Sequence, residues 1–323
     1  MELLSGVQER LGPLRAWLFP PRVFLQLEDQ AITAMALEGR RITWLERVAL
    51  PSGLCQNGEP LRVDALGDLI GDLLVERGAV GARLDAVLPA AASECRLIQW
   101  PAGCWPKDPQ QTLDQNAAEL GLARALQYLD LHLVPLDREP PTSLLVSVPS
   151  VLLDRWIEVF TLAGAALDRL ESASLCLARS AEPLWQAATA PDVCVVLQVE
   201  ASQTLLLALE QGVPMYQRRL PGLDQAAVLQ QDLQRWLLFW QQLRVASPEP
   251  PLLLLHGPAL ADATAAGDLV AALGCPWQTL DPLALQWLET STLSPDDAPA
   301  EGASVSGPSL ATLWGLAVAQ VLP

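Results

Sequence analysis

The chain has 323 residues, of which 51% are hydrophobic and 18% charged, so it is long enough for two ordinary domains and too apolar to be disordered. Its 37 acidic and 20 basic residues give a net charge of -17. That charge argues against nucleic acid and anionic lipid as partners and favours proteins. No stretch approaches the roughly 18 uninterrupted apolar residues of a membrane span.

Residues 1–22 precede the first predicted strand and lack the continuous apolar block of a secretory signal. We interpret them as a flexible leader and place the protein in the cytoplasm. Residues 11–22 contain too little basic and apolar character to indicate a helix on a membrane surface.

The cysteines show no metal-ligand spacing, and only His132 and His256 could join them as ligands. They are Cys55, Cys95, Cys104, Cys176, Cys194 and Cys275. We predict free thiols in a reducing compartment and no zinc site.

One short pattern occurs twice, because Gln26-x-Glu28 returns 172 positions later as Gln198-x-Glu200. In each copy an apolar strand reaches this pattern, a polar turn follows, and two more strands complete a meander, over residues 23–50 and 193–220. The repeat predicts two related half-domains.

The first half-domain is predicted over residues 23–92, with an amphipathic helix at 63–77 and a buried strand at 84–89. Residues 93–170 then read as a compact α+β insertion. Its predicted strands cover 95–100, 129–136 and 143–148, and its helices 110–120 and 151–163, with Gly164 ending the last helix.

The second half-domain is predicted over residues 171–323. It begins with a helical connector over 170–187, and after the meander come a helix at 224–243, strand 252–255, helix 261–273, strand 277–280 and a final helix at 309–320. Residues 289–307 form an acidic loop. His256 lies in the turn after strand 252–255, and no nucleophile or carboxylate is tied to it by spacing.

This order of elements resembles the actin-like ATPase superfamily, and within it the PilM-like type IV pilus assembly proteins. The resemblance covers nearly the whole chain from residue 23. It is carried by the two meanders, Leu229-Gln230-Gln231-Asp232-Leu233-Gln234-Arg235-Trp236 with Phe239-Trp240, the stretch 254–260, Leu273-Gly274-Cys275-Pro276, Asp281-Pro282 and Trp314-Gly315-Leu316-Ala317. It implies an α/β fold of duplicated actin-like, ribonuclease H-like half-domains with an inserted α+β subdomain.

The resemblance also marks a departure in the nucleotide motifs. Family members carry Asp-x-Gly in the first two strands of each meander, where this chain has Gln26-x-Glu28 and Gln198-x-Glu200. Glycine lets the backbone approach phosphate, whereas a glutamate obstructs and repels it, by about 4 kcal/mol per charge pair at about 4 Å and an effective dielectric near 20. We predict a pseudo-ATPase with no cofactor, because ATP with magnesium would bind weakly.

Two alternatives stay open for the glutamates. Glu28 and Glu200 could serve as magnesium ligands, or they could lie at strand ends and point to solvent. The family's Gly-Gly-Gly turn keeps only Gly257, between His256 and Pro258. Few residues separate the second meander from the helix that follows it, so the subdomain that closes over the nucleotide in family members is shortened here.

In PilM-like proteins the groove beside the inserted subdomain captures the cytoplasmic tail of the inner-membrane protein PilN, and the resemblance implies a PilN-like partner here. Trp100 and Trp105, each followed by proline, are the candidate groove residues. The implied role is a non-catalytic scaffold of the pilus alignment complex, peripheral to the inner membrane through its partner and connected to the pilus motor.

Twitching motility and competence for DNA uptake are both compatible with this role. One alternative is a component like the cytoplasmic part of GspL from type II secretion, although GspL continues into a membrane span and this chain stops at Pro323. The other is an active actin-like ATPase or a kinase of the same superfamily, because the fold hosts both activities.

Overall fold

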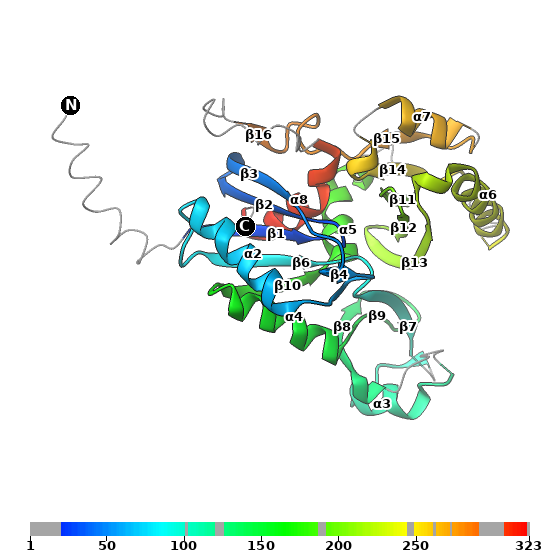
Figure 1. The fold of residues 1–323 in the computed structure, drawn as a ribbon. Helices are drawn as coiled ribbons and strands as arrows, with labels where there is room; N and C mark the ends of the chain where they lie inside the picture. Colours follow the sequence, from blue (N-terminus) through cyan, green and yellow to red (C-terminus); the bar gives the residue numbers. More distant parts are fainter. Residues whose placement is uncertain are drawn as a thin grey trace.

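The computed structural model describes residues 21–100, 103–119, 126–186, 192–243, 249–260, 263–271, 273–290 and 307–321 (Figure 1). Nearly all of the predicted leader and most of the predicted acidic loop therefore lie outside the described residues. No helix in the described ranges is long and apolar enough to cross a membrane.

The first sheet has the strand order β10-β6-β1-β2-β3-β16. Its strands are β1 (Arg22–Leu27), β2 (Ala31–Glu38), β3 (Arg41–Ala49), β6 (Arg83–Leu88), β10 (Ala166–Ser172) and β16 (Glu289–Thr290). The antiparallel meander β1-β2-β3 lies on one side, and β6 and β10 continue the sheet in parallel.

The second sheet has the order β13-β12-β11-β14-β15, which matches the first sheet strand for strand once β16 is set aside. Its strands are β11 (Val193–Val199), β12 (Gln203–Glu210), β13 (Val213–Pro221), β14 (Leu252–His256) and β15 (Trp277–Thr279). The register shifts at Ala36/Leu37 in one meander and at Ala208/Leu209 in the other, again 172 positions apart. The predicted duplication is confirmed.

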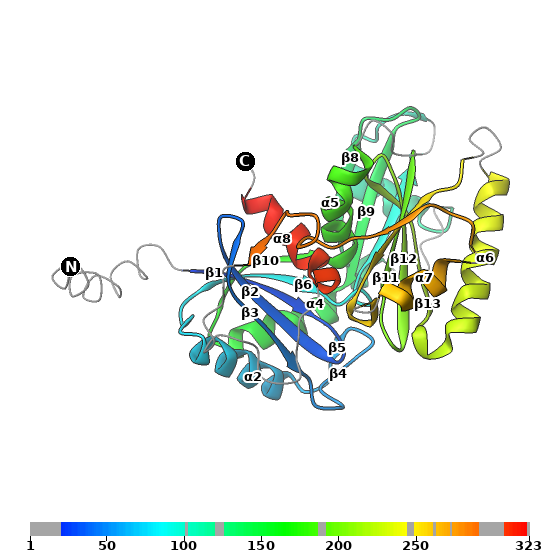
Figure 2. The same cartoon turned by 90° about the horizontal axis from the view of Figure 1, so that it is seen from above.

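Helices cover both faces of each sheet (Figures 1 and 2). The outer helices are α2 (Val63–Glu76) and α4 (Ser150–Leu162) on the first sheet, and α6 (Ala226–Leu243) and α7 (Ala263–Ala271) on the second. Between the sheets lie α5 (Ala173–Trp185) and α8 (Ala311–Val321), which pack on each other and on the inner faces of both sheets.

The insertion is a three-stranded antiparallel sheet in the order β7-β9-β8, from β7 (Glu94–Gln99), β8 (Leu129–Leu136) and β9 (Thr142–Pro149). One face of this sheet packs around Leu113 of helix α3 (Pro109–Asn116). Asp108 caps the start of α3, because its side chain accepts a 3.0 Å hydrogen bond from the Gln111 N–H. A small hairpin, β4 (Cys55–Gln56) with β5 (Glu59–Pro60), precedes α2. The predicted strands of the insertion are present, and its first helix ends earlier than expected, at Asn116.

The sheet topology departs from the predicted boundaries. Residues 166–172 form strand β10 beside β6, where a helical connector was predicted to start at 170. Helix α4 packs on α2, and β10 pairs with β6. The predicted insertion 93–170 therefore includes two elements, α4 and β10, that belong to the first half. In the same way, β16 and α8 return from the predicted second half to the first sheet.

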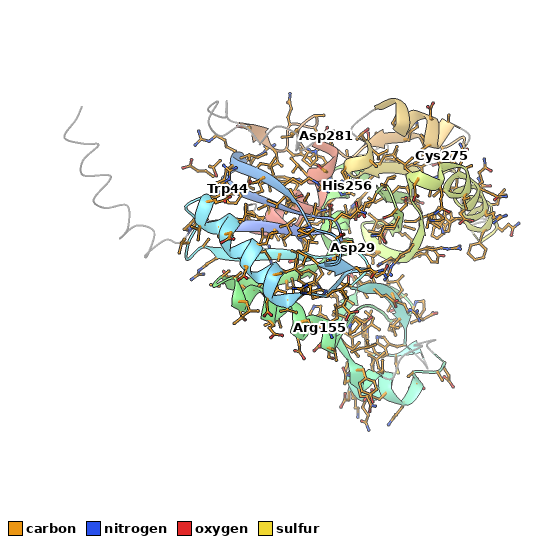
Figure 3. All side chains as sticks on the ribbon, in the orientation of Figure 1. Asp29, Trp44, Arg155, His256, Cys275 and Asp281 are labelled. Atoms are coloured by element: carbon orange, nitrogen blue, oxygen red, sulfur yellow. The ribbon has the colours of Figure 1, made fainter. Side chains whose placement is uncertain are left out.

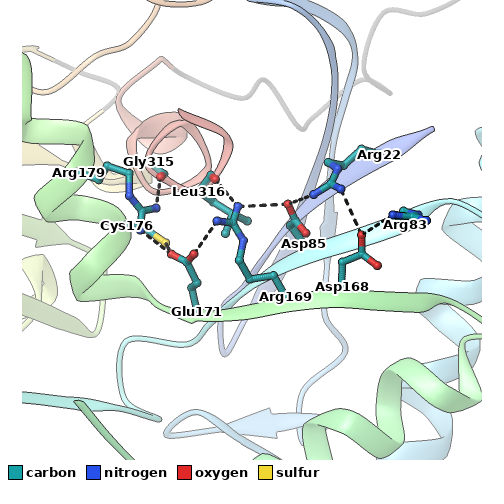
Figure 4. A network of polar contacts seen from close by, with 10 residues as sticks. All are labelled: Arg22, Arg83, Asp85, Asp168, Arg169, Glu171, Cys176, Arg179, Gly315 and Leu316. Atoms are coloured by element: carbon teal, nitrogen blue, oxygen red, sulfur yellow. Dashed lines mark hydrogen bonds and ion pairs between the residues drawn. The ribbon is translucent and has the colours of Figure 1, made fainter. Parts of the chain in front are cut away.

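The polar sequence of β10 explains why it was missed, since its charged residues are matched by partners from other elements (Figure 4). Arg169 pairs with Asp85 of β6 at 3.2 Å and, within β10, with Glu171 at 2.8 Å, and Glu171 in turn pairs with Arg179 of α5 at 3.0 Å. Arg22 also reaches Asp85, which is fully buried, at 2.8 Å. A half-buried edge strand can therefore contain charges when they are paired, and hydrophobic periodicity does not reveal it.

The crossing of α5 and α8 is unusually close. A Cβ added at Gly315 of α8 would lie 1.8 Å from the backbone oxygen of Cys176 in α5. Arg179 donates to the Gly315 carbonyl oxygen at 2.5 Å, and Arg169 to that of Leu316 at 2.7 Å (Figure 4). Glycine is thus required at position 315 by the distance between the two helices.

Replacing Gly315 with alanine should force the helices apart and lower the free energy of unfolding by about 1–3 kcal/mol or more, as overpacking does. Urea denaturation followed by circular dichroism measures this. Gly267→Ala in α7 is the matched control, because its nearest atom beyond the helix is 3.9 Å from the added Cβ. The control should be neutral or gain up to about 1 kcal/mol of helix propensity. Equal stability of the two variants would contradict the prediction.

Candidate functional site

The two Gln-x-Glu patterns meet where the halves face each other. Each lies at the end of the central strand of its sheet, β1 or β11, and both line one small cavity with Thr312 of α8. Asp29, next to Glu28, and His256, beside Gln198 in the second sheet, lie close to the middle of the molecule in Figure 3. The cavity measures about 10 Å³, which is enough for about one water molecule.

In the first copy, Glu28 is buried and its charge is balanced. The Gln26 Nε2 donates to Glu28 Oε1 at 2.7 Å, and Arg47 Nη2 reaches Glu28 Oε2 at 2.5 Å. Arg47 is itself fixed by a 3.0 Å hydrogen bond to Thr33 Oγ1. The exposed fraction of Glu28 is only 6%.

In the second copy, the glutamine again donates to the glutamate two positions on, with Gln198 Nε2 3.2 Å from Glu200 Oε1. The other oxygen accepts from Gln203 Nε2 at 3.3 Å, and no ion pair joins Glu200 to an arginine of the described residues. Burial raises the pKa of Glu200 to about 7, helped by the charges of Glu28 and Asp29 and opposed by the Gln203 hydrogen bond and Arg47.

These positions test one of the two alternatives for the glutamates. The interpretation that they point to solvent is wrong, because both turn into the seam between the halves and bond to their own glutamine. Their side chains occupy the space next to the strand ends. The described residues contain no group of three or more histidine, cysteine or acidic side chains that could hold a metal.

Gly257 has a structural reason to be glycine. Its φ is +127°, and an added Cβ would lie 2.2 Å from the Val199 carbonyl oxygen. His256 is the last residue of β14 rather than part of the turn, and its Nε2 lies 2.9 Å from Thr312 Oγ1. The retained glycine therefore fits the close approach of β14 to the end of β11 without any nucleotide.

A much larger groove lies beside the insertion, with a volume of about 870 Å³. The sheet face of β8 and β9, helix α5 with the end of β10, and the β12–β13 turn form its walls. Its lining is mainly apolar and includes Val134, Leu136, Leu144, Val146, Leu175 and Trp185. Arg138 links the β8–β9 connection to Glu210 of β12 at 2.9 Å, so the insertion is tied to the second half.

Comparison with known proteins gives the fold. No family model matches the sequence, and no curated protein matches it. The structure is similar to the PilM-PilN type IV pilus biogenesis complex, with a TM-score of 0.73 and 21% identity over 94% of this chain and 99% of that one. It is also similar to the cytoplasmic domain of EpsL, an inner membrane component of the type II secretion system of Vibrio cholerae, with a TM-score of 0.50 and 13% identity over 94% of this chain and 98% of that one.

The chain has the actin-like fold. The seam between the two halves brings Gln26, Glu28, Gln198 and Glu200 together, and Gly257 follows the end of the adjacent strand β14. That these residues form a vestigial nucleotide cleft stays a prediction.

The predicted groove tryptophans lie elsewhere. Trp100 is 3% exposed in the core on the α3 side of the insertion, where its Nε1 donates to Ser143 Oγ at 3.0 Å. Trp105 is 46% exposed and does not line the groove. The sequence does not reveal the lining of the groove of about 870 Å³, because the alternation along β8 locates a strand but not which of its faces meets α5.

Glu200 makes stability depend on pH. Its folded-state pKa is raised to about 7 from the ordinary value of 4.5, so the folded state holds the proton more tightly than the unfolded state. Stability should therefore be unaffected below about pH 4.5, fall as the pH rises to 7 and then level off. At about 1.4 kcal/mol per pKa unit, the loss is on the order of 3 kcal/mol at most.

Glu200→Gln should remove this loss, so its melting temperature should exceed that of the unmodified protein at pH 8 and match it near pH 5. Thermal melting across this pH range tests the expectation. Glu38→Gln, at an exposed glutamate, is the control and should follow the unmodified protein. A Glu200→Gln curve parallel to that of the unmodified protein would show that this carboxyl is not responsible.

Proposed function

We propose that the protein is a cytoplasmic, non-catalytic scaffold of a type IV pilus assembly complex that binds the cytoplasmic tail of a PilN-like inner-membrane protein. The observation that supports this most is the apolar groove of about 870 Å³ between the insertion and α5, on a fold similar to the PilM-PilN complex along almost the whole chain. The protein would be peripheral to the inner membrane through this partner.

The groove suits a short peptide better than a compact metabolite. It is mainly apolar, and its walls come from two strands, a helix and a turn, which is typical of peptide-recognition grooves. Asp130, Glu171 and Glu182 outnumber the single arginine, Arg179. A tail with apolar anchors and a basic residue would complement this lining.

The seam supports the absence of ATPase activity in this proposal. Two glutamate side chains stand where the fold's phosphate-binding turns require glycine, and about 10 Å³ remains between them. A nucleotide would have to displace both side chains and place its phosphates beside a carboxylate. The charge of Glu28, balanced by Arg47, leaves that arginine engaged rather than available for phosphate.

The likeness to the EpsL cytoplasmic domain favours a second candidate, the corresponding component of a type II secretion system. An active ATPase or kinase is the rival in another class. The two scaffold candidates differ in their partner, and the ATPase differs in its requirement for nucleotide.

Tail binding can be measured by fluorescence anisotropy with a labelled peptide of the cytoplasmic tail of the PilN-like protein from the same organism. Val134→Glu places a charge in the apolar groove and should weaken binding at least tenfold, about 1.4 kcal/mol. Leu136→Ala is the milder variant and should weaken it less. Val151→Glu on the exposed side of α4 is the control and should bind normally.

Trp105→Ala should also bind the tail normally, because Trp105 lies outside the groove. Unchanged affinity in a folded Val134→Glu protein would count against the groove as the tail site. Co-purification with a single-span protein, lost when its cytoplasmic tail is deleted, would support the partner independently.

Isothermal titration calorimetry with ATP and Mg²⁺ should show no saturable binding at micromolar nucleotide. The double variant Glu28→Gly, Glu200→Gly should hydrolyse no less ATP than the unmodified protein, because the unmodified protein is expected to hydrolyse none. Phosphate release above the blank that these substitutions abolish would favour the ATPase instead.

A further inference from the structure

A second concave site lies between the insertion and the second half. Strands β7 and β13 are the edge strands of two separate sheets, and they run side by side. A slot of about 580 Å³ opens between them, and the described residues that line it are Glu94, Cys95, Arg96 and the run Met215, Tyr216, Gln217, Arg218 and Arg219. We call this site the edge slot.

Side chains, rather than a backbone ladder, hold the two edges together. The Gln217 Oε1 accepts from the Cys95 N–H at 3.2 Å, and its Nε2 donates to the Ser93 carbonyl oxygen at 3.1 Å. Ser174 of α5 fixes the same amide at 2.9 Å. Because Gln217 is anchored from three sides, the slot is a built feature and its width is fixed.

The charge of the edge slot is opposite to that of the protein. Three arginines line it against the single acidic residue Glu94, in a chain with a net charge of -17. Within the described part of the chain, Arg218 and Arg219 form no ion pair with a carboxylate, and Arg219 donates to the Ala91 carbonyl oxygen at 2.5 Å. Most other described arginines are held by an acidic partner, as Arg47 and Arg138 are.

The shape of the slot favours an extended chain. Five consecutive residues of β13, from Met215 to Arg219, form one wall, and at about 3.3 Å per residue they span about 13 Å. This length accommodates four or five residues of an extended peptide, with strand edges on both sides and Arg218 and Arg219 at one end of the β13 wall. A single small anion would use only part of it.

We propose that the edge slot binds an acidic, extended peptide segment of a partner protein. Arg218 and Arg219 would pair with its carboxylates, and Tyr216 and Met215 would contact its backbone and side-chain stems. The site is separate from the tail-binding groove, because none of its lining residues lines that groove. The inference therefore does not rest on the proposed function.

The test uses the full chain and a fluorescent, end-blocked octapeptide of alternating glutamate and aspartate, with anisotropy as the readout. Saturable binding is expected at low salt and should weaken as salt rises. Arg218→Glu with Arg219→Glu should weaken it at least tenfold. Arg235→Ala, at an exposed arginine of α6, is the matched control and should leave it unchanged.

Arg218→Ala with Arg219→Ala is the second variant, in case charge reversal disturbs folding, and it should weaken binding several-fold with an unchanged circular dichroism spectrum. An octaglutamine peptide should not bind. The proposal is overturned if the acidic peptide does not bind, if it binds the double variants as well as the unmodified protein, or if Arg235→Ala weakens it equally. Binding of octaglutamine, or displacement by inorganic phosphate at the peptide's own concentration, would also overturn it.

Discussion

The arrangement of this molecule depends on the close crossing of α5 and α8 between the two sheets. Gly315 and the Cys176 carbonyl leave no space for a methyl group, and Arg169 and Arg179 bind carbonyl oxygens of α8 at the same place. The ion pairs behind these arginines are partly buried, and Asp85 is fully buried, so they are costly to desolvate unless every partner is positioned. Packing and polar contacts thus fix one relative position of the two half-domains.

Both candidate sites follow from that crossing. Thr312 at the start of α8 lines the seam between the Gln-x-Glu pairs, so the position of α8 sets how closely Glu28 and Glu200 approach. Leu175 and Trp185 at the two ends of α5 line the groove, so the same helix forms its wall. A shift of α5 would change the seam and the groove together, which links them mechanically.

Sequence reasoning could predict the fold because the two meanders keep their alternation, turns and spacing, and their bulges lie at matching positions. It could not predict which way Glu28 and Glu200 turn, because a glutamate at a strand end is ordinarily exposed. The partners that keep Glu28 buried include Arg47, 19 positions away on β3. The lining of the groove could not be predicted from the sequence for a similar reason, since its walls come from segments distant in the sequence.

The duplicated pattern is identical in sequence but not in electrostatics. Glu28 forms an ion pair with an arginine from its own meander, whereas the described partners of Glu200 are the side-chain amides of Gln198 and Gln203. The unbalanced negative charge of the seam is therefore that of Glu200, in the second copy. Burial and the facing Glu28 then raise the pKa of Glu200 to about 7. A proton on Glu200 relieves this repulsion, which is why the stability of the folded protein should depend on pH.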